Sequence, residues 1–244
     1  MEVLSNILAC RAGRRPLLAV LLDPEKAEEQ GRLLPLLGGA DLVFVGGSTG
    51  ATYSEYIAHV RQYTSRPIVL FPGNVGQFAP NADALLFISL LTARTGDVLI
   101  EPHIESAMAI RESGIETIPL GYILVDGGRA SSVEKATHSV PLSQEAKDEI
   151  VRTAVAGELL GKQMIYLEAG SGAKRPVAAD IIRAVREHIH VPLIVGGGIC
   201  STSAMLAAYE SGADIVVIGN HFEQKPEELP MFVDAKNVYA GSDR

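Results

Sequence analysis

Three short segments in the second half of the sequence combine glycines with the end of an apolar run. They are Tyr166-Leu-Glu-Ala-Gly-Ser-Gly172, Val195-Gly-Gly-Gly-Ile199 and Ile218-Gly-Asn220. Backbone N–H groups that no side chain covers, at the end of a strand, allow a phosphate to approach closely. We therefore predict one phosphate pocket built by three neighbouring loops, and a phosphorylated small molecule as substrate. The alternative is that these glycines only permit tight turns after the strands.

Glu168 follows directly on the apolar run of the first of these segments. A carboxylate at the end of a strand in an active site can act as a general base or bind a hydroxyl group. The alternative is an exposed glutamate at the edge of a loop, which is the usual place for this residue. Tyr166 could donate to a substrate oxygen or pack in the core. Lys174 and Arg175 could add charge near a phosphate or belong to a solvated loop.

A candidate metal site follows the first two apolar runs. Asp23 ends the first run and precedes Pro24, which is typical of a helix start with Asp as the N-cap. Its carboxylate is also a type of ligand that Mg²⁺ prefers. Ser48 follows the second run, within Gly46-Gly47-Ser48-Thr49-Gly50. Neither residue alone is decisive, but the two at adjacent strand ends favour a metal site.

Composition excludes several classes of partner. The chain has 244 residues, with 21 basic and 29 acidic residues and a net charge of −8. Nucleic acid is not expected as a partner, because binding a phosphate backbone requires a basic face. An anionic substrate approaches against this overall charge, so local donors or a metal must hold it.

The sequence indicates a cytoplasmic protein. It has two cysteines, Cys10 and Cys200, far apart and without the spacing of metal ligands. The first residues show no basic region followed by an apolar stretch, as a secretion signal would have. The longest apolar stretch, residues 84–93, is about half the length of a membrane span. The six histidines also lack metal-ligand spacing, and we assign them no catalytic role.

Apolar runs and helical patterns alternate along almost the whole chain. Most runs are continuous rather than alternating, as in parallel strands that are covered on both faces. The expected helices are residues 25–37, 144–160, 178–189 and 203–210. The expected strands are Leu17–Leu22, Leu42–Val45, Ile68–Phe71, Ala84–Ile88, Thr117–Val125, Met164–Leu167, Leu193–Val195 and Ile215–Ile218.

This rhythm predicts an α/β fold, a single (β/α)8 TIM barrel that forms one domain over residues 1–244. Residues 71–84 are rich in Pro, Gly and Asn, so we expect a modified barrel with a loop in place of the helix after strand three. The competing architecture, a doubly wound open sheet, usually has a glycine-rich loop after its first strand. Leu22-Asp-Pro-Glu-Lys26 stands there and contains no glycine.

Taken together, these motifs resemble the geranylgeranylglyceryl phosphate synthase family, which includes the heptaprenylglyceryl phosphate synthases. The resemblance extends from about Leu17 to Asn220, and its most specific block is residues 166–173. That family has a modified barrel that lacks one regular helix after strand three. The matching segments are Leu-Leu-Asp-Pro-Glu-Lys (21–26), Val-Gly-Gly-Ser (45–48), Phe-Pro-Gly (71–73), Tyr-Leu-Glu-Ala-Gly-Ser-Gly-Ala (166–173), Val-Gly-Gly-Gly-Ile (195–199) and Ile-Gly-Asn (218–220).

The resemblance implies a Mg²⁺-dependent prenyltransferase of ether-lipid biosynthesis. It would join the 3-hydroxyl of sn-glycerol 1-phosphate to C1 of a long-chain prenyl diphosphate, such as geranylgeranyl diphosphate, and release diphosphate. Asp23 and Ser48 would hold Mg²⁺, and Glu168 would accept the hydroxyl proton. The acceptor would lie against Tyr166, Leu167, Glu168, Ala169, Gly170, Ser171, Gly172, Gly197, Gly198, Gly219 and Asn220.

The resemblance further implies a homo-oligomer, and lipid substrates make peripheral membrane contact plausible. Many prenyltransferases carry an aspartate-rich Mg²⁺ motif, which this sequence lacks. Two alternatives stay open. One is a sugar-phosphate isomerase or lyase barrel, which would share the phosphate site without needing Mg²⁺ or an apolar groove. The other is a barrel that binds a phosphorylated ligand without turnover.

Overall fold

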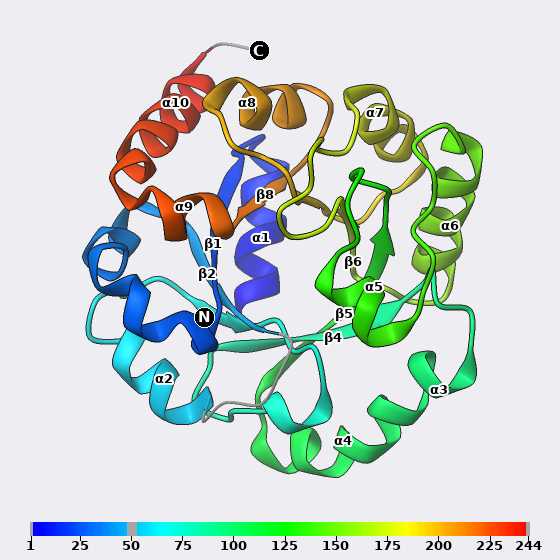
Figure 1. Ribbon diagram of the computed structural model, residues 1–244, viewed down its shortest axis with the longest axis horizontal. Helices are drawn as coiled ribbons and strands as arrows, with labels where there is room; N and C mark the ends of the chain where they lie inside the picture. Colours follow the sequence, from blue (N-terminus) through cyan, green and yellow to red (C-terminus); the bar gives the residue numbers. More distant parts are fainter. Residues whose placement is uncertain (1, 48–52, 243–244) are drawn as a thin grey trace.

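A computed structural model describes residues 2–47 and 53–242, and its centre is a closed barrel of eight parallel strands. The strands pair in sequence order, and β8 closes the barrel by pairing with β1 (Figure 1). This confirms the predicted α/β fold class and the (β/α)8 barrel. The strands are β1 (Leu17–Leu22), β2 (Leu42–Val45), β3 (Ile68–Leu70), β4 (Ala84–Leu90), β5 (Glu116–Leu124), β6 (Met164–Glu168), β7 (Leu193–Gly196) and β8 (Ile215–Ile218).

Helices surround the barrel, and the connection between β3 and β4 holds only a short 3₁₀ turn. That turn is η3 (Val75–Gln77), so the predicted loop after strand three is confirmed. No described helix is long and apolar enough to cross a membrane. The α-helices are α1 (Val3–Ala12), α2 (Tyr53–Val60), α3 (Gly96–Leu99), α4 (Glu101–Ser113), α5 (Ser132–Thr137), α6 (Lys147–Leu159), α7 (Ala179–His188), α8 (Thr202–Glu210), α9 (Asn220–Gln224) and α10 (Leu229–Gly241), with a further 3₁₀ turn η4 (Pro226–Glu228).

The prediction of one α-helix over residues 25–37 is wrong. Two 3₁₀ segments occupy this region, η1 (Pro24–Arg32) and η2 (Leu34–Gly39). Lys26 has non-helical backbone angles, and Pro35 stands near the start of η2. Proline has no N–H to donate within a helix and its ring collides with the preceding turn, so one continuous α-helix cannot pass through Pro35.

The helix predicted from residue 144 begins three residues later, at Lys147. The Gln144 side chain connects two loops instead. Its amide nitrogen donates to the carbonyl oxygens of Asp126 at 2.8 Å and Pro176 at 3.1 Å, and its amide oxygen accepts from the Ala178 N–H at 2.9 Å. These bonds join the loops after β5 and β6, which both reach the predicted site.

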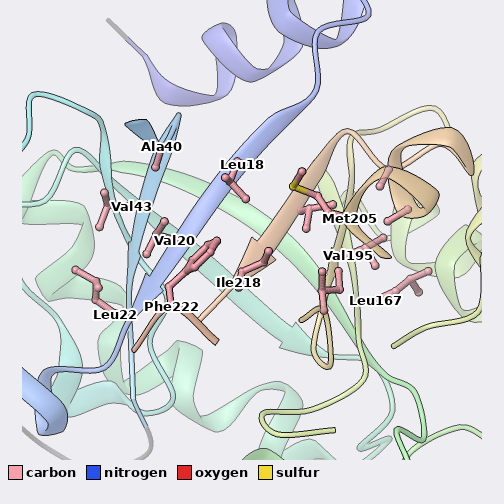
Figure 2. Close-up of a cluster of buried hydrophobic side chains, with 14 of the residues drawn as sticks. Leu18, Val20, Leu22, Ala40, Val43, Leu167, Val195, Met205, Ile218 and Phe222 are labelled. Carbon is pink, nitrogen blue, oxygen red and sulfur yellow. The ribbon is translucent and has the colours of Figure 1, made fainter. Parts of the chain in front are cut away.

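The strands are apolar on both faces because each face packs on a different layer. Leu18, Val20 and Leu22 of β1 point outward toward the helices, where Ile218 and Phe222 join them (Figure 2). The alternate residues Leu17 and Ala19 belong to a second cluster inside the barrel. Burying one such large aliphatic side chain contributes about 1.5–3 kcal/mol. Alternation within a continuous apolar run thus decides which side chains face the interior.

Helix α1 closes the end of the barrel where the strands begin. Its buried residues Val3, Ile7 and Cys10 pack against the interior cluster, and α1 lies in the middle of the ring of strands (Figure 1). The Glu116 carboxylate, at the start of β5, accepts from the N–H groups of Val3 at 2.5 Å and Leu4 at 2.8 Å. Helix α1 therefore fills the end of the barrel where the strands begin, and the predicted phosphate loops lie at the opposite end.

Candidate active site

Strand β6 brings Tyr166 and Glu168 to the interior near the open end of the barrel. Side chains alternate along a strand, so Met164 and Tyr166 join the interior cluster. Leu167 points the other way, into the outer cluster beside Val195 (Figure 2). Leu167 is one of the residues predicted to contact the acceptor. Because its side chain points outward, only its backbone can reach the site.

Glu168 is a buried carboxylate with two hydrogen bonds. Only 8% of the residue is exposed, and one carboxylate oxygen accepts from the Gly170 N–H at 2.7 Å. The Tyr166 hydroxyl donates the second bond. Burial raises the pKa of Glu168 above its usual value, and the two hydrogen bonds, which lower the pKa, only partly offset this. A carboxylate held this way is a stronger base than an exposed one.

An aromatic cluster lies beside Glu168 inside the barrel. The rings of Tyr122 and Tyr166 meet edge to face with centroids 5.1 Å apart, and Phe71 lies 5.7 Å from each of them. Burial, together with the Glu168 charge, raises the pKa of both tyrosines well above the usual value. Both hydroxyls therefore stay protonated. Tyr166 is 1% exposed, so it combines the two roles of core packing and orienting Glu168.

The glycines after β7 are required by their close approach to the loop after β6. Gly197 has a φ of +82°, and a methyl group there would overlap the Glu168 carboxylate and lie 2.6 Å from the Gly170 nitrogen. A methyl group at Gly196 would overlap the Tyr166 hydroxyl. These glycines therefore have a structural role. It does not exclude ligand binding, because the same close approach brings the two loops together.

Several backbone N–H groups of these two loops have no acceptor among the described residues. Ala169 donates to the Gly196 carbonyl at 3.0 Å, and Gly170 donates to Glu168. Within the described chain, no hydrogen bond uses the N–H groups of four loop residues. Those residues are Ser171, Gly172, Gly197 and Gly198, and all four are exposed or half-buried. Donors that water or a ligand must satisfy, on two adjoining loops, suit an anion.

Asn220, after β8, joins the same group of loops. A Cβ atom on Gly172 would lie 3.9 Å from the Asn220 amide nitrogen. The Asn220 amide oxygen accepts from the Lys26 ammonium at 3.3 Å, and Lys26 also forms an ion pair of 2.6 Å with Glu223. Gly219, the residue before Asn220, is packed against Leu21 of β1. The loops after β6, β7 and β8 therefore lie together, as the phosphate prediction requires.

Asp23 acts as a helix N-cap and lies against the end of β2. One carboxylate oxygen accepts from the Glu25 N–H at 3.1 Å, and a methyl group at Gly47 would overlap this same oxygen. Ser48, the second predicted metal ligand, lies outside the described residues. Within the described part of the chain, no three His, Cys, Asp or Glu side chains form a group able to hold a metal ion. Asp23 alone is a sparse site.

A family model described as PcrB matches residues 13–236 of this chain, which includes every loop discussed above. The chain belongs to the PcrB family. Curated relatives agree with this assignment. A geranylgeranylglyceryl phosphate synthase of Spirosoma linguale is 44% identical over 222 residues, covering 88% of this chain and 89% of the relative. One from Korarchaeum cryptofilum is 41% identical, covering 93% and 96%.

A solved structure shares the fold of this PcrB-family chain closely. It is the (S)-3-O-geranylgeranylglyceryl phosphate synthase of Thermoplasma acidophilum in complex with its substrate sn-glycerol 1-phosphate. The TM-score is 0.87 with 27% identity, and the match covers 98% of this chain and 99% of the other. This match confirms the resemblance to the geranylgeranylglyceryl phosphate synthase family that the sequence motifs indicate.

Arg129 is a residue of this PcrB-family chain that the sequence did not reveal as part of the site. Its guanidinium would lie 3.5 Å from a Cβ atom on Gly172, and it has no hydrogen bond or ion pair within the described residues. Arg175, which was considered from the sequence, instead pairs with Asp126 at 2.9 Å. Lys174 is exposed. Nothing local in the sequence marks Arg129, because its place depends on how two loops meet.

Proposed function

We propose that this PcrB-family chain is a prenyltransferase of ether-lipid biosynthesis that joins sn-glycerol 1-phosphate to a prenyl diphosphate. The relatives named geranylgeranylglyceryl phosphate synthase match about nine-tenths of both chains. The Thermoplasma acidophilum enzyme, which binds sn-glycerol 1-phosphate, has the same fold at 27% identity. By the relatives' names, we propose geranylgeranyl diphosphate as the donor.

The observation that carries the proposal is the group of unpaired N–H donors beside a buried carboxylate. We assign the phosphate of the acceptor to the N–H groups of residues 171–172 and 197–198, together with Gly219 and Asn220. Arg129 supplies a positive charge near Gly172. The glycerol part then lies toward Glu168, whose carboxylate contacts the Gly197 segment. One site thus holds the anion and presents a base.

Glu168 is assigned the role of general base. The oxygen of the 3-hydroxyl forms a bond to C1 of the prenyl chain while the bond from C1 to the diphosphate oxygen breaks. The hydroxyl proton goes to Glu168, and diphosphate leaves with the electron pair of the broken bond. Because burial raises the pKa of Glu168, the carboxylate accepts this proton more readily than an exposed one would. Tyr166 and the Gly170 N–H keep it oriented.

The residues present fit a magnesium ion that is coordinated mainly by the substrate. Mg²⁺ usually keeps several waters and binds proteins through one or two carboxylates plus phosphate oxygens. Asp23 provides one carboxylate beside the end of β2, and we propose Ser48 as the second ligand. The ion would neutralise charge on the departing diphosphate.

Partly buried apolar side chains provide a surface for the prenyl chain. Leu21, Phe71, Ile88, Val98 and Val133 pack against the interior cluster while keeping exposed area. The neighbouring helices α3 and α4 have no buried residue among those described. An apolar surface beside the reacting carbon also limits access of water to a cationic C1. We further propose a cytoplasmic homo-oligomer with peripheral membrane contact.

The test is incubation with labelled sn-glycerol 1-phosphate and prenyl diphosphates of several lengths, followed by extraction and analysis of the lipid product. We expect an ether product that requires Mg²⁺ and disappears with EDTA. Activity that persists after chelation would overturn the metal role. Binding of sn-glycerol 1-phosphate without any product would favour the non-catalytic barrel, and turnover of a sugar phosphate would favour the isomerase or lyase.

A further inference from the structure

A side-chain network connects η1, which follows β1, with helix α9, which follows β8. The Lys26 ammonium in η1 donates to the Asn220 amide oxygen at 3.3 Å and to the Glu223 carboxylate at 2.6 Å. Asn220 and Glu223 both belong to α9. The Glu223 side chain is only 6% exposed, whereas that of Lys26 is half-buried at 37%. The network therefore joins the segment after Asp23 to a residue of the proposed phosphate site.

Gln30 holds Glu223 from a second side. Gln30 is completely buried, and its amide nitrogen donates to the Asp23 carbonyl oxygen at 2.9 Å and to the Glu223 carboxylate at 3.5 Å. The Gln30 amide oxygen accepts from the Tyr56 hydroxyl. A buried ion pair is stable only where further hydrogen bonds satisfy its charged groups, and Gln30 and Asn220 provide those bonds here. The position of the Lys26 ammonium is thus well determined.

The bond from Lys26 determines which way the Asn220 amide faces. An ammonium group only donates hydrogen bonds, so the Asn220 atom that faces Lys26 is the amide oxygen. The amide nitrogen lies on the other side, toward the loop after β6, where a Cβ atom on Gly172 would be 3.9 Å away. In the part of the chain that the structure describes, this nitrogen donates to no acceptor. The amide therefore presents N–H donors to a loop whose own N–H groups suit an anion.

Reversal of the Asn220 amide would weaken an anion site at this loop. The oxygen and nitrogen of an asparagine amide are nearly the same size, so hydrogen-bond partners decide between the two orientations. Phosphate oxygens accept hydrogen bonds, and they would be repelled by an amide oxygen in the place of the nitrogen. Lys26 prevents this reversal, because it would then have to bond to an N–H group.

We propose that Lys26 is a positioning residue for the acceptor and acts through Asn220. Lys26 keeps the N–H groups of the Asn220 amide directed at the phosphate of sn-glycerol 1-phosphate, and Glu223 keeps Lys26 in place. The inference rests on the proposed function, which assigns the acceptor phosphate to the loops around Gly172 and Asn220. The segment that follows Asp23, on the donor side of the site, then also determines how tightly the acceptor binds.

Four variants separate this role from simple packing. Lys26→Met removes the ammonium and keeps an unbranched side chain, but it leaves the Glu223 carboxylate without its cation. Lys26→Met combined with Glu223→Leu avoids this, because apolar groups replace the whole ion pair. Glu223→Gln removes the negative charge and keeps the Lys26 donor on Asn220. The matched control is Lys147→Met, which breaks an exposed ion pair of 3.1 Å with Asp180.

Calorimetric titration measures the Kd for sn-glycerol 1-phosphate, and steady-state assays measure KM and kcat for the ether product. We expect both Lys26 variants to raise the Kd and the KM at least about fivefold, because a donor to a charged phosphate is lost, with kcat within about threefold of the wild type. Glu223→Gln and Lys147→Met should each keep the Kd within about twofold, because both retain the donor on Asn220. Thermal melts identify the variants that are folded.

The same measurement in an Asn220→Ala background tests the route through the amide. There, Lys26→Met should change the Kd less than about twofold, because the group that Lys26 orients is absent. An unchanged Kd in the folded Lys26 variants overturns the proposal. A loss in Glu223→Gln as large as in Lys26→Met, or an undiminished loss in the Asn220→Ala background, also overturns it. Failure of the proposed function is a different result, in which the wild type itself binds no sn-glycerol 1-phosphate or forms no ether.

Discussion

Replacing Glu168 by glutamine separates the chemical role of this residue from its structural one. The glutamine oxygen can still accept from the Gly170 N–H, which lies 2.7 Å from the carboxylate in the wild type. Its amide nitrogen can donate to the Tyr166 hydroxyl, reversing the direction of that bond. Glutamate and glutamine side chains have the same shape, so Gly197 can still pack closely against residue 168. Folding is therefore retained while the base is removed.

The expected loss falls mainly on turnover. A positioned general base contributes about 10²–10⁴ in rate, which corresponds to about 2.7–5.4 kcal/mol of barrier. The bond from a carboxylate to the acceptor hydroxyl exceeds a neutral one by about 1 kcal/mol, or about fivefold in affinity. We therefore expect kcat to fall at least about 100-fold and the Kd for sn-glycerol 1-phosphate to change about fivefold or less.

Turnover falls in the Glu168→Gln variant, whereas its folding stability at pH 7 should rise. Below pH 4.5, the usual value for glutamate, the carboxyl group is protonated in the folded and unfolded chains alike. Because burial raises the pKa of Glu168 in the folded chain, the folded state binds the proton over a wider range, and wild-type stability falls as pH rises through that pKa. Glutamine does not carry this charge. The melting temperature of the variant should exceed that of the wild type at pH 7, and the difference should vanish near pH 4.

The assay is single-turnover product formation with labelled acceptor, beside calorimetric binding of the acceptor and thermal melts from pH 4 to 8. Glu116→Gln is the control, because this carboxylate lies at the closed end of the barrel and caps α1. A kcat for Glu168→Gln within threefold of the wild type would refute the assignment of the base. A variant that melts lower than the wild type at pH 7 would refute the electrostatic reasoning.

Three further substitutions test binding of the acceptor, the packing of the glycine loops and the closed end of the barrel. Arg129→Gln should raise the KM for sn-glycerol 1-phosphate about tenfold or more, since a hydrogen bond to a charged group contributes about 1.5–3 kcal/mol. The control Arg175→Gln, which breaks only the pair with Asp126, should change this KM less than threefold. Gly197→Ala should lower the unfolding free energy by at least about 1–3 kcal/mol because of its φ of +82°, whereas Gly38→Ala, with open space around it, should be nearly neutral in a denaturant titration. Glu116→Gln should lower the unfolding free energy by about 1 kcal/mol in the same titration with no change in kcat.

The strands were predictable because parallel strands that are buried on both faces leave continuous apolar runs. Leu17–Leu22, Leu42–Val45 and Ile215–Ile218 were predicted with the bounds that the structure shows. Elsewhere the ends differ by one or two residues, as for β4, which continues to Leu90. The order of the strands followed from the rhythm of the runs, because a βα repeat of this length closes into a barrel.

Features that depend on contacts between distant segments were not predictable. Helix α1 was missed because its apolar residues are recognisable only once the barrel offers an open end to fill. Arg129 was missed because its neighbour Gly172 is far along the chain. The 3₁₀ geometry of η1 and η2 reflects the local conflict between an apolar pattern and Pro35. The single-domain organisation and the roles of Asp23 and Ser48 stay predictions.

The balance of charges at the open end explains why glycine loops, rather than basic side chains, were the informative signal. Lys26 is paired with Glu223 at 2.6 Å, and Arg175 is paired with Asp126 at 2.9 Å. Both of these cations already have an acidic partner, so we assign the anion to Arg129 and the uncharged N–H donors. A neutral N–H donor attracts an anion only at close contact. Such donors therefore bind an anion that fits the loops without attracting all other anions. In a protein of net charge −8, the proposed binding of a small phosphate would therefore rest on the backbone N–H groups of loops that their glycines leave accessible.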